Sequence, residues 1–377
     1  MGSAVDGSLE MRLLCYGARL HADAARLQNI REIAVQQVID WSRLIKLAIA
    51  HGVLPLLHKN LTQAAPTGID VPLQSIKHQC KLNTIRNLQL TQALQDVLHL
   101  LEDNHISAIP FKGPSLATLA YGDISLRQFS DLDVLIRPQD FSRARSVLLF
   151  NQYSRIESVF GTGESEAQDL KQITVLGECS FLHPDGLTLL DLHGRLLTGE
   201  FPISTVSLDT FRQNLATVEL LNQPVKTFCP ENLLLYLCIH GTKDFWKKLV
   251  WLCDIAALIE SHPQLDQARV IEQSCRLGCE QMLGLGLALV RDVLGVELPK
   301  AIAQHIQATF KKRSLSIQIQ QRLLNGDFPQ DIQHFYLERF YFYGQMQKTL
   351  AAEMYYYLRY APRFAMAGLS SRLQSNR

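Results

Sequence analysis

The sequence carries almost no net charge of either sign, since 37 lysine and arginine residues stand against 36 aspartate and glutamate residues. A protein that binds nucleic acid through bulk charge is far more basic, so the composition gives no strong nucleic-acid signal. Long apolar runs are also missing, and no window reaches the roughly 18 apolar residues that indicate a membrane span. The first residues show no apolar signal core. We therefore expect a cytoplasmic protein without a membrane span.

Paired cysteines are the next absence. None of the eight cysteines forms a C-x-x-C pair, and none has histidine neighbours at zinc-finger spacing. We interpret them as free thiols of a reducing compartment. The 377 residues are long enough for two or three domains, and 47% of them are apolar, which is ample for sizeable cores.

Helical patterns at both ends of the chain enclose a segment with strand-like patterns. We expect an N-terminal helical region over residues 1–78, a catalytic core over 79–225 and a C-terminal helical domain over 226–377. A helix is predicted over about 73–104, preceded by a linker or long turn over 62–72. The fold class is therefore α+β, with a small sheet flanked by helices.

Within this core, residues 131–138 alternate with a period of two and end at a proline, which is typical of a strand. Residues 173–196 hold two more strand-like runs. Pro184, Asp185 and Gly186 separate these runs, and such residues predict a hairpin turn.

Two carboxylates define the most informative strand. Asp131 and Asp133 are two residues apart, so both point to one face, while Leu132, Val134 and Ile136 point to the other. Adjacent like charges repel, and a divalent cation such as Mg²⁺ removes that repulsion. A polar edge that faces solvent would show the same spacing, so on spacing alone both interpretations stay open.

A turn upstream offers a place for phosphate. Lys112, Gly113, Pro114 and Ser115 follow a predicted strand and begin a short helix. Glycine permits a tight turn, proline suits a first helical position, and free amides at a helix start attract phosphate, to which Lys112 adds a charge. Other strand-to-helix turns share this composition, so the motif gains weight only beside the two aspartates.

Asp191, on the far strand of the predicted hairpin, is a third carboxylate. One pair and one single carboxylate on neighbouring strands predict a two-metal site for phosphoryl transfer. In that chemistry the third carboxylate takes the proton of the attacking hydroxyl or lies next to it.

These residues carry a family resemblance. The stretch resembles the nucleotidyltransferase superfamily of DNA polymerase beta, and more closely a family of uncharacterised bacterial nucleotidyltransferases often found beside natural-product and peptide-modification genes. The matching features are Lys-Gly before the helix, Tyr121 and Arg127 before D-L-D-V-L, D-L-H-x-x-L from Asp191, and H-G-x-K-x-x-W-x-x-L-x-W-x-x-D from His240. The resemblance runs from about residue 8 to 260.

The resemblance implies a small mixed β-sheet and a magnesium-dependent nucleotidyltransferase. Asp131, Asp133 and Asp191 would hold two Mg²⁺ ions, and an NMP would pass from an NTP to an acceptor hydroxyl. AMP from ATP is the default, and a peptide, a protein or a small molecule such as a natural-product intermediate is the candidate acceptor. The chain departs from the superfamily at Gly113-Pro114, where relatives have Gly-Ser or Gly-Gly.

The resemblance leaves four further residues as candidates for nucleotide binding. Arg127 either reaches a triphosphate or pairs with Asp131. His193 contacts nucleotide or acceptor, or is a core histidine. His240 and Lys243 are one helical turn apart and can reach the same cleft.

Two other functions stay open. The chain could be a nucleotide-binding or scaffold protein with weak or no turnover, which Gly113-Pro114 favours. It could also be a toxin that nucleotidylates tRNA or protein, although the low net charge does not favour tRNA.

Overall fold

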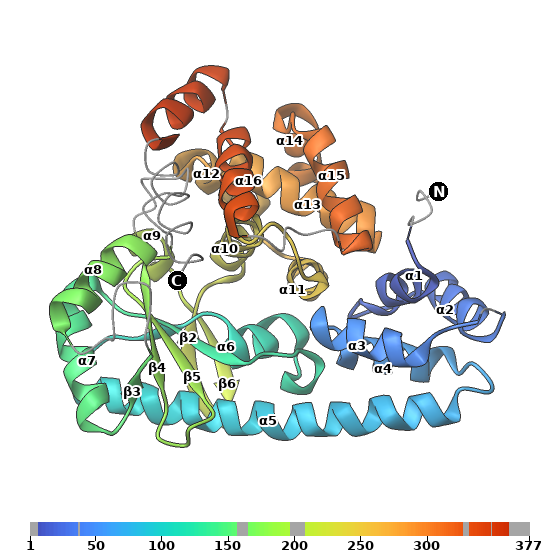
Figure 1. Ribbon diagram of the computed structural model, residues 1–377, viewed down its shortest axis with the longest axis horizontal. Coiled ribbons are helices and arrows are strands. Elements are labelled where there is room, and N and C mark those ends of the chain that lie inside the picture. Colours follow the sequence, from blue (N-terminus) through green and yellow to red (C-terminus); the bar gives the residue numbers. More distant parts are fainter. Residues whose placement is uncertain are drawn as a thin grey trace.

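The computed structural model describes residues 7–36, 38–156, 165–196, 208–326, 332–347 and 349–361. Helices surround a five-stranded mixed sheet and a separate two-stranded hairpin (Figure 1). The predicted α+β fold class, with a small mixed sheet flanked by helices, is therefore confirmed.

In the described N-terminal part of the chain, four short helices are followed by one long helix. Asp40 caps α3 by accepting a hydrogen bond from the Arg43 amide, a favourable arrangement at a helix start. The predicted linker over 62–72 is too long, because α4 continues to Ala64 and α5 begins at Asp70. These helices are α1 (Leu9–Gly17), α2 (Ala24–Gln36), α3 (Trp41–Ala50), α4 (Leu54–Ala64) and α5 (Asp70–Asp103).

Helix α5 links the N-terminal helices to the sheet. Its 34 residues extend for about 50 Å at the usual rise per residue, and it runs along one side of the molecule (Figure 1). The periodicity of its second half predicts an inward stripe of Leu90, Leu94, Val97, Leu98 and Leu101. All of these are buried except Leu98, which is half-buried. The boundary that we expect at residue 78 falls inside this continuous helix, and the division into domains stays a prediction.

The five-stranded sheet has the order β1-β2-β5-β4-β3. Only β2 and β5 pair in parallel, and the other neighbours are antiparallel. The strands are β1 (Ile109–Pro110), β2 (Asp131–Leu135), β3 (Ser154–Arg155), β4 (Glu178–Leu182) and β5 (Leu189–His193).

Between these strands lie short helical segments. Part of one predicted strand is wrong: residues 173–176 are the last turn of α8, which ends at Gly177 in a left-handed conformation. A short apolar run fits the period of a buried helix as well as that of a strand, so the sequence alone could not separate them. The segments are α6 (Gly113–Leu116), η1 (Ala117–Tyr121), η2 (Ile124–Leu126), η3 (Pro138–Asp140), α7 (Phe141–Phe150) and α8 (Glu166–Leu176).

One face of the sheet is apolar, and the other carries the three aspartates. Leu132 and Val134 of β2 and Leu190 and Leu192 of β5 join one hydrophobic core with the second half of α5 and with α7. The alternation predicted for β2 is thus confirmed. The residues that alternate with these positions point to the opposite face, and the three aspartates are among them.

A second and larger core joins the two ends of the chain. It contains buried residues of α1 to α4 together with those of the C-terminal helices, and Arg19 of the N-terminal part forms an ion pair with Glu260. The C-terminal elements are α9 (Leu208–Arg212), β6 (Ala216–Leu220), β7 (Gln223–Thr227), α10 (Pro230–Lys243), α11 (Leu249–Ser261), α12 (Gln267–Leu277), α13 (Glu280–Leu294), α14 (Lys300–Thr309), α15 (Arg313–Asn325) and α16 (Ile332–Gln345).

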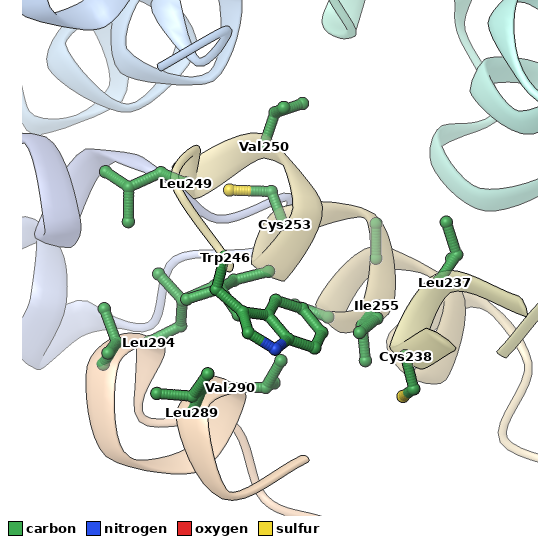
Figure 2. Packing of buried hydrophobic residues seen from close by; sticks show 14 of the residues in the cluster. Leu237, Cys238, Trp246, Leu249, Val250, Cys253, Ile255, Leu289, Val290 and Leu294 are labelled. Atoms are coloured by element: carbon green, nitrogen blue, oxygen red, sulfur yellow. The ribbon is translucent and has the colours of Figure 1, made fainter. Parts of the chain in front are cut away.

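Trp246, in the turn between α10 and α11, lies at the centre of the C-terminal helices. Its side chain is fully buried and packs among apolar residues that include Ile255, Leu289 and Val290 (Figure 2). A Cβ atom at Gly241 would lie 2.4 Å from the indole ring, so only glycine leaves room for it. Among the described residues, no helix is long and apolar enough to cross a membrane.

Candidate active site

The pairing of β2 with β5 brings the three predicted carboxylates to one face of the sheet. Asp133 lies directly opposite Asp191 in the parallel register, and Asp131 lies two residues earlier on β2. Since alternate residues of a strand share a face, all three side chains point away from the apolar core. We call Asp131, Asp133 and Asp191 the carboxylate cluster.

Lys112 approaches this cluster from the turn that begins α6. Its Nζ atom lies 2.8 Å from Asp133 Oδ1, and the same ammonium lies 5.8 Å from the ring centroid of Tyr236 on α10. Gly113 is needed for the turn: its φ is +52°, and an added Cβ atom would come within 3.2 Å of the Asp131 carbonyl oxygen. The glycine thus brings Lys112 close to β2.

His193 is the second side chain that contacts Asp133. It is buried beside the ring of Phe111, and its Nε2 atom lies 3.0 Å from Asp133 Oδ1. Its Nδ1 atom lies 3.3 Å from a carboxylate oxygen of Glu178 on β4. A ring nitrogen held by each carboxylate fixes the orientation of the imidazole.

The electrostatics of the cluster are uneven. Burial alone would raise the pKa of Asp133, but Lys112 and His193 lower it far below its ordinary range. Burial and the neighbouring Asp133 charge raise the pKa of Asp131, and the same two causes raise that of Asp191 to about 6. Ser180 on β4 donates a hydrogen bond of 2.5 Å to Asp191. The surroundings therefore favour the ionised form at Asp133 and disfavour it at Asp131 and Asp191.

Ser115 is fully buried, and its hydroxyl is one of the buried polar groups that find no hydrogen-bond partner among the described residues. An unsatisfied hydroxyl next to Lys112 and Gly113 is unusual, because buried polar groups are nearly always paired. Its place in the turn agrees with the sequence, but its burial separates it from solvent.

One interpretation of the sequence pairs Arg127 with Asp131, but the structure shows a different partner. Its guanidinium binds both oxygens of Asp254 on α11, at 2.7 and 2.9 Å, and the Tyr121 hydroxyl donates to the same carboxylate at 2.7 Å. We call these three residues the Arg127–Asp254 cluster. Arg127 is only 7% exposed, so its charge is largely committed to holding α11 against the turn before β2.

His240 lies near Lys112 at the carboxylate cluster, whereas the contact found for Lys243 involves its backbone carbonyl. The His240 ring stacks on Tyr236, with centroids 5.8 Å apart, and Lys112 lies over that same tyrosine ring. Burial, together with the charges of Lys112 and Lys243, lowers the pKa of His240 well below its ordinary value. The Lys243 carbonyl accepts a hydrogen bond from the Tyr343 hydroxyl at 2.9 Å. Their roles in nucleotide binding stay predictions.

Comparison with known protein families places this chain in one of them. The sequence model of a family described as uncharacterised nucleotidyltransferase matches residues 37–295, which is more than half of the chain. The protein belongs to this nucleotidyltransferase family. The family name makes it a transferase, and every residue of the carboxylate cluster lies within the matched range.

No curated protein matches the chain. The solved structures that resemble it include an antigenic nucleotidyltransferase-like protein from Paracoccidioides brasiliensis. The two chains are 14% identical, the match covers 60% of this chain and 95% of that chain, and the TM-score is 0.33. Another is the antibiotic-resistance factor ANT(2'')-Ia, which is 12% identical, with 52% of this chain and 91% of that chain covered and a TM-score of 0.32. At TM-scores this low, neither likeness carries an argument about this nucleotidyltransferase.

Sequence reasoning missed three residues of the site. Ser180 and Glu178 face the cluster because β4 pairs with β5 in a register that sets them opposite Asp191 and His193. Tyr236 reaches Lys112 from α10. The alternation of Glu178 and Ser180 with buried Cys179 and Phe181 is the one signal that points to this strand, whereas nothing local indicates Tyr236.

The carboxylate cluster fits Mg²⁺ by donor chemistry, because hard divalent cations prefer carboxylate oxygens and their charge would offset the repulsion between neighbouring aspartates. In the described part of the chain, the one group of three candidate ligands whose atoms lie within 4.8 Å of one another is Cys275, Glu280 and His305. The three aspartates do not converge in that way, so holding an ion would require their side chains to rotate toward one another.

Proposed function

We propose that this nucleotidyltransferase moves an NMP from an NTP to a hydroxyl group of an acceptor and depends on Mg²⁺. The observation that carries the proposal is the parallel pairing that sets Asp133 opposite Asp191, with Asp131 on the same face. ATP is the default donor because it is abundant. The candidate acceptor is a peptide, a protein or a small molecule such as a natural-product intermediate.

Asp131, Asp133 and Asp191 would hold the metal. If the site follows two-metal chemistry, they would hold two Mg²⁺ ions. The bound metal would neutralise charge on the triphosphate. Raised pKa values at Asp131 and Asp191 support this assignment, because they mark carboxylates that lack a sufficient positive partner.

Lys112 would contact the triphosphate. Its ammonium lies at the edge of the cluster, 2.8 Å from Asp133, and a lysine so placed can turn from a carboxylate to a phosphate oxygen. Gly113 brings the turn close to β2. The Ser115 hydroxyl has no described partner, but it is fully buried and would have to become accessible before it could contact a phosphate. Arg127 would act on the nucleotide only through the position of the turn, since Asp254 holds its side chain.

Asp191 would accept the proton of the acceptor hydroxyl. The hydroxyl oxygen forms a bond to the α-phosphorus while its proton passes to the carboxylate. The bond from the α-phosphorus to the bridging oxygen breaks, and pyrophosphate leaves with that electron pair. Positioning and charge neutralisation supply most of the rate enhancement in such reactions.

A second candidate is a nucleotide-binding protein with weak or no turnover. The observation that favours it is the contact of both Lys112 and His193 with one oxygen of Asp133. These contacts already satisfy a carboxylate that a metal would need.

The two candidates differ in whether ATP is cleaved between its α- and β-phosphates. The protein is incubated with Mg²⁺ and ATP labelled on the α- or the γ-phosphate, with and without candidate acceptors, and the products are separated. We expect labelled pyrophosphate from γ-labelled ATP and label on the acceptor from α-labelled ATP, with both lost in Asp131→Asn. The exposed Asp96→Asn variant is the matched control.

Other results would change the assignment. Release of inorganic phosphate instead of pyrophosphate would contradict nucleotidyl transfer, and binding without any product would favour the second candidate. Transfer to tRNA or to a protein would instead identify a nucleotidylating toxin.

A further inference from the structure

Three C-terminal helices bring a thiol, a carboxylate and an imidazole together outside the carboxylate cluster. Cys275 lies near the end of α12, Glu280 begins α13, and His305 lies in α14. Their ligand atoms all lie within 4.8 Å of one another. None of these helices contributes a residue to the carboxylate cluster.

The spacing of the three atoms is close to that of a tetrahedral ion site. Cys275 Sγ lies 3.2 Å from Glu280 Oε1, and His305 Nε2 lies 3.7 Å from the same oxygen. Ligand bonds of about 2.0–2.3 Å to zinc at tetrahedral angles separate neighbouring ligand atoms by roughly 3.3–3.6 Å. Small side-chain rotations therefore suffice to place one ion between them.

His305 provides an independent observation. Its Nε2 atom is buried, yet it makes no hydrogen bond among the described residues, and it faces the carboxylate of Glu280, which is only 5% exposed. A buried imidazole nitrogen without a partner is rare because its desolvation is not repaid. A metal ion would be a partner for this nitrogen.

We propose that Cys275, Glu280 and His305 form a site for Zn²⁺. A thiolate and an imidazole select zinc over magnesium, which prefers oxygen ligands. The Cys275 thiol loses its proton to solvent as the sulfur–zinc bond forms, and the ion loses water molecules as the three side chains replace them. One water stays as the fourth ligand. Cys275 is exposed, which gives the ion a path from solvent.

The ion would join α14 to α12 and α13. Any ligand that binds only the folded state stabilises it, so zinc would raise the melting temperature of the full chain. This effect does not depend on the proposed transfer reaction, because the ligands lie on other elements.

The test uses the full-length protein, freed of metal by a chelator and titrated with ZnCl₂ in excess MgCl₂. We expect one zinc per chain, and Cys275→Ser and His305→Gln should each weaken zinc binding by at least about tenfold, since losing even an indirect support of a metal ligand costs 10–100-fold. Cys80→Ser removes another partly exposed thiol and should bind zinc as the wild type does. Asp133→Asn changes the carboxylate cluster and none of the three proposed zinc ligands, so it should also bind zinc as the wild type does.

Cobalt gives a second measurement that does not require a folded variant. Wild-type protein with Co²⁺ should show a thiolate-to-cobalt charge-transfer band and the visible bands of a tetrahedral ion, and Cys80→Ser should show the same spectrum. Absence of the thiolate band in the wild type would overturn the proposal. Unchanged zinc affinity in Cys275→Ser and His305→Gln would overturn it as well.

Discussion

Two buried charged clusters meet in the sequence where Arg127 precedes Asp131 by four residues, and their charges are balanced in different ways. In the Arg127–Asp254 cluster, one fully buried carboxylate receives two bonds from a guanidinium and one from a tyrosine hydroxyl. In the carboxylate cluster, Lys112 and His193 both contact Asp133, while Asp131 and Asp191 carry raised pKa values beside it.

Under the proposed function, the difference separates a structural role from a functional one. A carboxylate whose oxygens are all paired with a guanidinium holds helix α11 to the turn before β2 and has nothing left to offer a ligand. A group of carboxylates with too few cations is unfavourable by itself and gains from an added cation. A buried charge whose balance is incomplete is therefore a candidate ligand site.

The largest effect should come from breaking the balanced cluster. Asp254→Asn leaves Arg127 buried without its counter-charge, and removal of one partner from a buried ion pair costs about 3–5 kcal/mol. The free energy of unfolding, measured by urea denaturation, should fall by that amount. Asp96→Asn, at an exposed position, should leave it unchanged. A loss no larger than that of the control would show that the pair contributes nothing to stability.

A smaller effect is expected at Lys112. A charge-assisted contact to phosphate contributes roughly 1.5–3 kcal/mol, so Lys112→Ala should weaken ATP binding about tenfold to a hundredfold. Calorimetry with Mg²⁺ and a non-hydrolysable ATP analogue measures this. Lys226→Ala, on the exposed side of β7, serves as control. Equal affinity in Lys112→Ala and wild type would place the triphosphate elsewhere.

Asp191 should respond with the opposite sign to Asp254. Burial and Asp133 raise its pKa from 3.8 to about 6, so the folded protein binds this proton more tightly than the unfolded chain. Stability from this group is present below pH 3.8 and is lost as the pH rises to about 6. In metal-free buffer at pH 8, Asp191→Asn should therefore melt a few degrees above wild type.

The same variant pair checks the sign across pH. The difference in melting temperature between Asp191→Asn and wild type should shrink as the pH falls from 6 toward 4. A variant that melts below wild type at pH 8 would mean that the ionised Asp191 is stabilised in the fold, and the contrast between the two clusters would fail.

The smallest effect is expected at Pro114. Pro114→Ser restores a backbone N–H at the start of α6, and a donor there should leave ATP affinity unchanged or slightly tighter. The same calorimetric titration applies. Weaker binding would show that the rigid proline presets the turn next to Gly113.

The sequence predicts the face of the cluster but not its partners. Strand alternation alone places Asp131 and Asp133 opposite Leu132 and Val134, because side chains of a strand point to alternate faces. Asp191 follows from a predicted neighbouring strand, although its exact pairing with Asp133 depends on register.

The remaining contacts could not be foreseen, because they join distant parts of the chain. Arg127 and Asp254 are separated by 127 residues, whereas Asp131 is the carboxylate of the site that lies closest to Arg127 in sequence. Glu178 reaches His193 only through the register of β4 with β5. Long-range packing and register are absent from local periodicity, which also explains why residues 173–176 were open to a strand assignment.

Nucleotide binding at the carboxylate cluster is tested most directly by titration of a non-hydrolysable ATP analogue into wild type, Asp133→Asn and Asp96→Asn, each with and without Mg²⁺. We expect Mg²⁺-dependent binding in wild type and Asp96→Asn, and its loss in Asp133→Asn while the circular dichroism spectrum stays that of the folded protein. Equal, Mg²⁺-dependent affinity in folded Asp133→Asn would contradict the assignment of this cluster as the nucleotide and metal site.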